Sequence, residues 1–312
     1  MTSLRPRSGG PGQPSIRRQS PRYGERIVMV MLFAAGALSV VVTVGIVVAL
    51  LFPAIEFFRE IPIWRFLTGT RWAPTFADAN FGVLPLITGT LWTTVIGLMV
   101  AIPIGLAAAI YLAEYADPRV RKIFKPALEV LAGIPSVVYG YFALAFVAPK
   151  LLNDILQVDV GTYSVLAAGL VLGIMIIPTI ASLSEDSLTA VPQSLRQGSL
   201  ALGANRMRTT LRVVVPAAIS GIAASIVLGL SRAVGETMIV ALAAGTQAQM
   251  VSSPTENGQT MTGYIAQTAT GESTPGTLTY NTLFAVGLLL FTITLIINII
   301  SIALVRRFRE AY

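Results

Sequence analysis

The sequence has 312 residues, of which 54% are hydrophobic and 12% are charged, and its mean hydropathy is +0.74. So few charged side chains cannot cover the surface of a soluble globular protein, so the composition predicts an integral membrane protein. The chain has no cysteine and no histidine. This excludes disulfides, zinc–thiolate sites, iron–sulfur clusters and histidine-dependent nucleophiles, and we expect no metal site.

Long segments with few or no charged side chains predict the membrane-spanning helices. An α-helix crosses about 30 Å of hydrocarbon with about 20 residues. Arg232 and Glu236 interrupt one segment, but counting it as two crossings would place the basic ends of the chain on opposite sides of the membrane. The six expected helices lie near residues 27–52, 84–112, 128–148, 162–184, 213–245 and 279–305.

The net charge of +7 mainly reflects membrane topology. With six crossings, 17 of the 22 Lys and Arg residues lie on the same side as both termini, four lie on the other side, and Arg232 lies within a helix. Because basic residues are enriched in cytoplasmic segments, both termini are expected in the cytoplasm. The predicted fold class is therefore an all-α integral membrane protein with six transmembrane helices.

Three parts of different composition follow one another along the chain. Residues 1–26 are rich in Pro, Gly, Ser and Arg and predict a disordered basic tail at the cytoplasmic leaflet. Residues 27–80 combine the first transmembrane helix with an extracytoplasmic loop that starts at Pro53. Residues 81–312 form the core of the protein, which includes a long cytoplasmic loop at 185–212.

The loop 185–212 has the sequence pattern of a short helix. Pro192 suits the start of a helix, Gly203 suits a left-handed C-terminal cap, and Asn205 can cap a second helix. An apolar face at helical spacing is formed by Leu188, Val191, Leu195 and Leu202. Such a short helix cannot bury this face alone, so it lies either on the membrane domain as a connecting loop or against a cytoplasmic partner.

Residues 194–204, Ser-Leu-Arg-Gln-Gly-Ser-Leu-Ala-Leu-Gly-Ala, resemble the cytoplasmic motif of ABC importer permeases. In that family Glu-Ala-Ala is followed after three residues by glycine and later by proline, which correspond to Gly203 and Pro216. This chain has Gln-Gly-Ser at 197–199, so a neutral carboxamide replaces the acidic group. The resemblance implies that the helix binds a groove of an ATPase subunit. The residues implied in this contact are Pro192, Leu195, Arg196, Gln197, Leu202, Gly203 and Arg206.

Several further motifs narrow the resemblance to phosphate importers. They occupy residues 81–90, 109–115, 131–140, 175–178 and 232–238. In this order they resemble the permease subunits of phosphate ABC importers, and the ending Gly-Glu-Thr-Met is more similar to the C-type subunit (PstC) than to its partner. The resemblance covers roughly residues 81–305. It implies the type I importer permease fold and a multi-pass protein of a bacterial or archaeal plasma membrane.

The resemblance also implies a set of partners. An extracytoplasmic phosphate-binding protein would deliver phosphate, a homologous second permease subunit would complete the pathway in the bilayer, and a dimer of ATPase subunits would supply energy. The chain has no Gly-x-x-x-x-Gly-Lys-Ser/Thr loop for ATP phosphates. Mg-ATP is therefore expected in the partner ATPase, with no cofactor and no enzymatic activity in this chain, and we expect no nucleic-acid partner.

Arg232 and Glu236 are charged residues in an otherwise apolar segment. Placing arginine in the hydrocarbon layer costs at least about 2.5–3.5 kcal/mol on insertion scales, so it should face a partner or a pathway. In a continuous helix, residues four apart share one face at about 6 Å. The pair is either a structural ion pair or an anion site.

In the anion-site interpretation, Arg232 offers a fixed fork of donors to phosphate oxygens, and Glu236 competes with the substrate so that binding stays weak. The resemblance favours this interpretation, because the family has its Arg and Glu in the same stretch. The remaining candidates for the pathway are Thr237, beside this pair, and Ser136 and Tyr139, whose hydroxyls follow Pro135.

Other functions stay open from the residues alone. A gradient-driven anion carrier or channel would use Glu236 as its proton-coupling carboxylate. In a membrane enzyme or a structural subunit, Arg232 and Glu236 would be only an ion pair. Within the ABC family, another oxyanion such as sulfate remains an alternative substrate, because arginine alone does not distinguish sulfate from phosphate.

Overall fold

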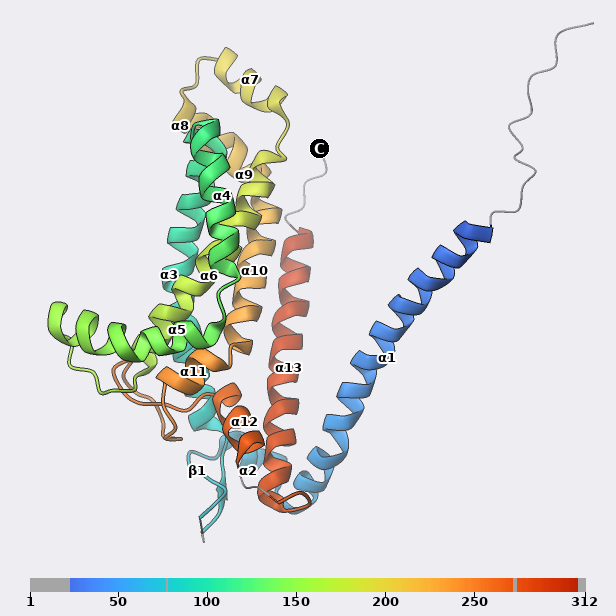
Figure 1. The fold of residues 1–312 in the computed structure, drawn as a ribbon, viewed down its shortest axis with the longest axis vertical. Coiled ribbons are helices and arrows are strands. Elements are labelled where there is room, and N and C mark those ends of the chain that lie inside the picture. Colours follow the sequence, from blue (N-terminus) through green and yellow to red (C-terminus); the bar gives the residue numbers. More distant parts are fainter. Residues whose placement is uncertain (1–22, 77, 272–273, 308–312) are drawn as a thin grey trace, which may run out of the picture. The chain divides into compact units, whose positions relative to one another are not determined.

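The computed structural model describes residues 23–76, 78–271 and 274–307. The described residues are mostly helical (Figure 1). The chain divides into two compact units between Val48 and Ala49, and helix α1 (Tyr23–Glu60) runs through this boundary. Residues 1–22 of the predicted tail lie outside the described residues, and the last four, 23–26, are helical. The predicted start of the outer loop at Pro53 is wrong, because α1 continues through this proline.

The second unit contains the remaining elements. A short antiparallel sheet pairs β1 (Trp72–Ala73) with β2 (Asn80–Phe81). Three segments are π-helical, namely η1 (Tyr111–Tyr115), η2 (Ala143–Ile155) and η3 (Thr210–Val214). The α-helices are α2 (Ile63–Thr68), α3 (Leu84–Ile110), α4 (Pro118–Ala132), α5 (Ser136–Phe142), α6 (Val165–Thr189), α7 (Gln193–Ala201), α8 (Arg206–Thr209), α9 (Val215–Ala217), α10 (Ile219–Gly235), α11 (Met238–Ala243), α12 (Met261–Thr270) and α13 (Leu278–Arg307).

Within the described residues, five helices are long and apolar enough to cross a membrane. They cover Gly24–Glu60, Leu84–Tyr115, Ser136–Ile155, Val165–Thr189 and Leu278–Ala303. The pair Arg206–Ala217 and Ile219–Gly235 also passes this test together, although it is bent by 69°, and counts as a sixth span if it crosses as one. The all-α membrane fold is therefore confirmed, with five or six candidate spans.

The core is built around α3 and α6, which form the most extensive helix pair in the described part of the chain. Small residues let the two backbones approach. A Cβ atom on Gly173 would lie 2.8 Å from the carbonyl oxygen of Gly97, and one on Gly169 would lie 2.7 Å from the Ile96 side chain. Buried apolar side chains such as Leu172 and Ile176 fill the space around this contact.

Gly173→Ala should destabilise the subunit by about 1–3 kcal/mol, since the added methyl group meets backbone and forces α3 and α6 apart. Thermal unfolding of the purified protein in detergent would measure the change. Gly198→Ala in α7 is the matched control, because a Cβ atom there meets nothing within 4 Å. Equal unfolding temperatures for the two variants would contradict the close approach.

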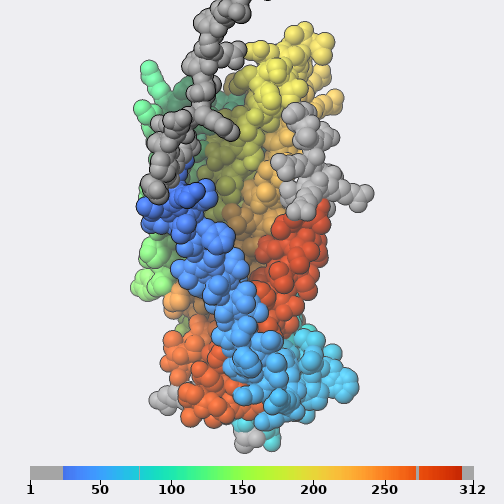
Figure 2. All heavy atoms as spheres, turned by 90° about the vertical axis from the view of Figure 1, so that its right-hand side faces the viewer, coloured from blue at the N-terminus to red at the C-terminus, as the bar shows by residue number. Residues whose placement is uncertain are grey.

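A second cluster packs the end of α1 and the segment after it against the C-terminal helices. It joins Phe57, Phe66 and Trp72 to Met261 of α12 and Val286 of α13. The aromatic rings meet edge to face, with Trp72 and Tyr264 centroids 5.0 Å apart. Figure 2 shows these segments side by side at one end of the second unit, in light blue and orange-red.

Two expected helices are broken. The helix predicted at 128–148 is wrong as a continuous element, because α4 ends at Ala132 and α5 begins at Ser136 with a different direction (Figure 1). Gly133 and Pro135 lie in the break, where the proline lacks a backbone donor and disfavours a helical conformation of the residue before it.

The helix predicted at 213–245 is also interrupted. It bends by 69° at Ala218, after Pro216, and it ends at Gly235 before the short helix α11 starts at Met238. The following segment 244–260 is largely irregular and leads to α12, which the pattern of apolar residues did not predict. The break after Gly235 decides the geometry of Arg232 and Glu236.

Candidate functional site

Arg232 and Glu236 do not lie on one helical face. Arg232 is in the last turn of α10, which ends at Gly235, whereas Glu236 has an extended conformation with φ −65° and ψ 132°. The Glu236 carboxylate accepts hydrogen bonds from the backbone N–H groups of Met238 (3.1 Å) and Ile239 (3.3 Å). It therefore caps α11, where the helix dipole stabilises a negative charge. The expected helical pairing is wrong, and no ion pair joins the two described side chains.

The Arg232 guanidinium is exposed within this subunit. Within the described residues it makes one side-chain hydrogen bond, from Nη1 to the Thr179 hydroxyl of α6 at 3.3 Å. Tyr139 of α5 lies within electrostatic reach of its charge. Because a guanidinium has five N–H donors in a fixed fork, most of them are available to a ligand. Sequence reasoning missed Thr179; its only local signal is a hydroxyl beside Pro178 in an apolar helix.

The other pathway candidates lie on α5 and in the connection between α10 and α11. A Cβ atom on Gly140 would lie 2.8 Å from the Leu242 side chain, so the two helices are in close contact. The buried Tyr139 donates its hydroxyl to the Leu131 carbonyl at 3.0 Å, and the half-buried Ser136 starts α5. Thr237 lies between α10 and α11 and donates to the Gly235 carbonyl at 3.3 Å.

The loop 185–212 folds as the sequence predicts at its main turns. Pro192 immediately precedes α7, and Gly203 has φ +84°, the left-handed conformation of a C-terminal cap. The Asn205 side chain accepts a hydrogen bond from the Arg208 N–H at 2.8 Å and caps α8. Figure 1 shows α7 at one end of the helix bundle formed by the second unit.

Two arginines of this loop bind the membrane domain. Arg196 forms an ion pair with Glu114 of η1 at 2.9 Å and donates to the backbone carbonyls of Leu188 (2.7 Å) and Val191. The exposed Arg206 places its guanidinium 5.1 Å from the centre of the Tyr115 ring. Their contacts are internal, and sequence reasoning assigned these residues to partner contact without seeing Glu114.

The apolar residues of α7 divide between two faces. Leu195 packs with the buried Leu188 and Val191, but Leu202 is 90% exposed and Leu200 is 50% exposed. The expectation that Leu202 shares the buried face is wrong, because α7 ends at Ala201 and the chain turns away at the cap. Gln197 is exposed as well, so α7 and its C-cap residue together present an exposed surface with two large apolar side chains.

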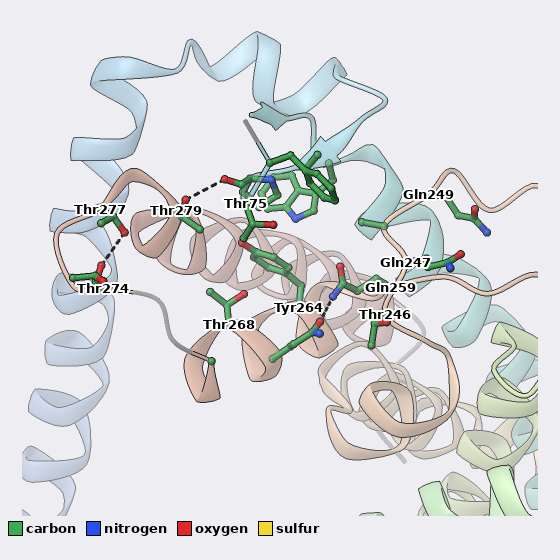
Figure 3. A pocket seen from close by; sticks show the side chains of 17 residues that line it. Thr75, Thr246, Gln247, Gln249, Gln259, Tyr264, Thr268, Thr274, Thr277 and Thr279 are labelled. Atoms are coloured by element: carbon green, nitrogen blue, oxygen red, sulfur yellow. Dashed lines mark hydrogen bonds between the residues drawn. The ribbon is translucent and has the colours of Figure 1, made fainter. Parts of the chain in front are cut away.

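A cavity of about 870 Å³ lies among β1, α12 and the start of α13 (Figure 3). Thr and Gln side chains dominate its lining, including Gln259, Gln267 and Thr268, and none of the lining residues carries a carboxylate, ammonium or guanidinium group. A site for a charged oxyanion normally offers charge-assisted donors. This cavity therefore fits an anion less well than the surroundings of Arg232. In the described part of the chain, no acidic residues cluster as a metal site would require.

Comparison with known families decides the identity of the fold. Residues 101–310 match the family described as binding-protein-dependent transport system inner membrane component. The chain belongs to this family. The structure is similar to that of a bacterial ABC transporter involved in the import of the acidic polysaccharide alginate, with a TM-score of 0.57 and 15% identity over 88% of this chain and 99% of the other. The family's ABC importer permease fold is therefore confirmed.

Two bacterial permeases have a higher sequence identity to this chain than the alginate transporter does. This chain is 39% identical over 243 residues to the probable ABC transporter permease protein YqgH of Bacillus subtilis. The aligned segment covers 78% of this chain and 76% of the relative. It is also 34% identical over 278 residues to the phosphate transport system permease protein PstC 1 of Mycobacterium tuberculosis. This alignment covers 78% of this chain and 82% of the relative.

Proposed function

We propose that this chain is a membrane-spanning permease subunit of an ATP-driven importer of inorganic phosphate. Its relatives of the C-type phosphate permease group support the substrate. The observation that carries the proposal within the molecule is the exposed guanidinium of Arg232 at the junction of α5, α6, α10 and α11, with Thr179 as its one side-chain hydrogen-bond partner in the described residues. A planar fork of permanently charged donors suits a phosphate ion.

Glu236 holds the shape of this junction. Its carboxylate accepts hydrogen bonds from backbone N–H groups at the start of α11 and does not pair with Arg232, so the Arg232 guanidinium can bind a substrate anion. The negative charge of Glu236 also repels a phosphate ion bound at Arg232, which keeps phosphate binding weak enough for release. In this proposal Ser136, Tyr139 and Thr237 line the pathway with this pair.

The surface of α7 binds the ATPase. The exposed Leu200 and Leu202 enter an apolar groove of that partner, while Arg196 of α7 and Arg206 of α8 fasten the loop to η1. Each Mg-ATP is held by the dimer of ATPase subunits, and this chain holds no cofactor. Movement of α7 reaches Arg232 through α8, η3, α9 and α10, which follow α7 along the chain.

The complete importer contains three other kinds of subunit. A homologous permease covers the open side of the pathway, the ATPase dimer lies on the cytoplasmic side with α7 and both termini, and an extracytoplasmic phosphate-binding protein delivers the ion. The assembly lies in the plasma membrane of a bacterium or archaeon. The exposed apolar side chains of α13, such as Ile299 and Ile300, suit contact with lipid or with the second permease.

Reconstitution of the purified assembly in liposomes tests this function. We expect labelled phosphate to enter only with ATP, the binding protein and the ATPase present. Sulfate, supplied with the same binding protein, should not enter at a comparable rate. Uptake by this chain alone, driven by an ion gradient, would instead support a carrier or channel and contradict the proposal.

A further inference from the structure

Glu185 is a buried carboxylate at the base of the loop that leads to α7. Its side chain is 1% exposed and lies near the C-terminus of α6, where the helix dipole disfavours a negative charge. Burial of an ionised carboxylate requires charged partners and hydrogen bonds. The charged side chains that bind Glu185 come from α4, a helix more than 50 residues earlier in the chain, and Thr189 of α6 adds a hydrogen bond.

The partners of Glu185 form a compact network. Lys125 donates to one carboxylate oxygen at 2.7 Å, and Arg121 forms an ion pair with the other. The Thr189 hydroxyl donates a hydrogen bond of 3.2 Å to the Glu185 oxygen that pairs with Arg121. The same hydroxyl accepts a hydrogen bond of 3.1 Å from Arg121. Lys125 also pairs with Asp186, and these two acidic groups raise its pKa above the usual value. The network joins two helices through the buried Glu185 carboxylate, whereas Arg121 and Lys125 stay partly exposed.

The helix α4 has little else to hold it at this end of the molecule. None of its residues is buried in the described subunit, and Ile123 and Phe124 are exposed. Within the described subunit, apolar packing therefore contributes little to the position of α4, and the charges of Arg121 and Lys125 fix it against α6. A change in the direction of the Glu185 side chain would shift α4 with it.

The other end of α4 leads directly to the proposed pathway. Tyr139 of α5 donates its hydroxyl to the Leu131 carbonyl in the last turn of α4, which ties the two helices across their break. The helix α5 in turn packs against α11, whose first turn is capped by Glu236. A displacement of α4 therefore reaches both Tyr139 and the cap of α11.

The side chain of Arg196 connects α7 to the base of this network. It bonds to the Leu188 and Val191 carbonyls, which lie within six residues of Glu185 in the chain. We propose that Glu185 is a positioning residue that transmits movement of α7 to α4 and α5, as a second connection besides the path through α10. This inference rests on the proposed function, in which a partner ATPase moves α7.

Distance measurements between spin labels test the inference. This chain has no native cysteine, so it can be labelled at the introduced positions alone before the importer is assembled. One label pair joins α7 to α3 (Ser194→Cys with Met99→Cys), and another joins α4 to α3 (Ile123→Cys with Met99→Cys); all three positions are exposed and lie outside the proposed ATPase contact. In the assembled importer, a non-hydrolysable ATP analogue should change both distances. With Glu185→Gln, the α7 distance should change as before, and the α4 change should fall by at least about half.

Transport measurements give a second readout. Glu185→Gln should lower the number of phosphate ions imported per ATP hydrolysed by about tenfold, with the ATPase still bound. Arg121→Gln keeps the Lys125 ion pair, so it preserves the fold better and should give an intermediate loss. Lys122→Gln, an exposed residue of the same helix, is the matched control and should leave the ratio unchanged.

The outcomes separate this inference from the proposed function. An undiminished α4 movement in Glu185→Gln would overturn the role of Glu185 and leave the proposed function in place. An α7 distance in the wild-type importer that does not respond to the ATP analogue would overturn the coupling role of α7, and the inference with it.

Discussion

Arg232→Gln should reduce phosphate uptake by the reconstituted importer at least about 100-fold. Glutamine keeps two donors but loses the positive charge, and each lost charge-assisted hydrogen bond to phosphate is worth about 1.5–3 kcal/mol. The exposed guanidinium has one side-chain partner in the described part of the chain, Thr179, so its replacement should leave the fold intact. ATP-dependent uptake of labelled phosphate measures the loss.

Two further variants make this prediction specific. Arg232→Lys keeps the charge without the planar fork, so we expect it to retain about a tenth of the wild-type uptake. Arg71→Gln removes an exposed arginine from the segment before β1 and should transport normally. Wild-type uptake by Arg232→Gln, in a complex of normal composition, would exclude Arg232 from the pathway.

Leu202→Asp should release the ATPase from the permease. If Leu202 enters an apolar groove of that partner, a carboxylate there costs on the order of 2–4 kcal/mol, which raises the dissociation constant roughly 30- to 1000-fold. The side chain is 90% exposed in the subunit, so its own folding should not suffer. Co-purification of the ATPase and a direct affinity measurement would report the effect.

An equivalent change away from α7 is the control. Leu156 follows η2, at a distance along the chain from the loop, and is also exposed, so Leu156→Asp should retain the ATPase. If Leu202→Asp binds the ATPase as tightly as this control, the contact surface lies elsewhere on the loop.

Local features of the chain could be predicted from the sequence. The conformations at Gly203 and Asn205 depend on the residue itself and its neighbours, and both are confirmed. Four of the six apolar segments predicted continuous spans, because hydrocarbon thickness sets a minimum length for a helix that crosses the membrane. The resemblance to importer permeases also rested on local motifs, which the family match confirms.

The broken helices and the long-range contacts could not be predicted in this way. A proline in an apolar segment is compatible with a kinked helix or with a break, and at Pro135 the structure has a break between α4 and α5. The cap formed by Glu236 depends on a helix end that the spacing of Arg232 and Glu236 does not reveal. Arg196 and Glu114 are 82 residues apart, and Arg232 and Thr179 are 53 apart, so only the fold brings them together.

The 69° bend at Ala218 has a mechanical consequence. The 12 residues Arg206–Ala217 make an arm about 18 Å long at the helical rise of about 1.5 Å per residue. A rotation of this arm by about 10° around Ala218 moves its far end, beside α7, by about 3 Å. The helix α10 meanwhile rotates about its own axis. The bend thus lets a modest sideways displacement at the end of the molecule become a small rotation of the helix that carries Arg232.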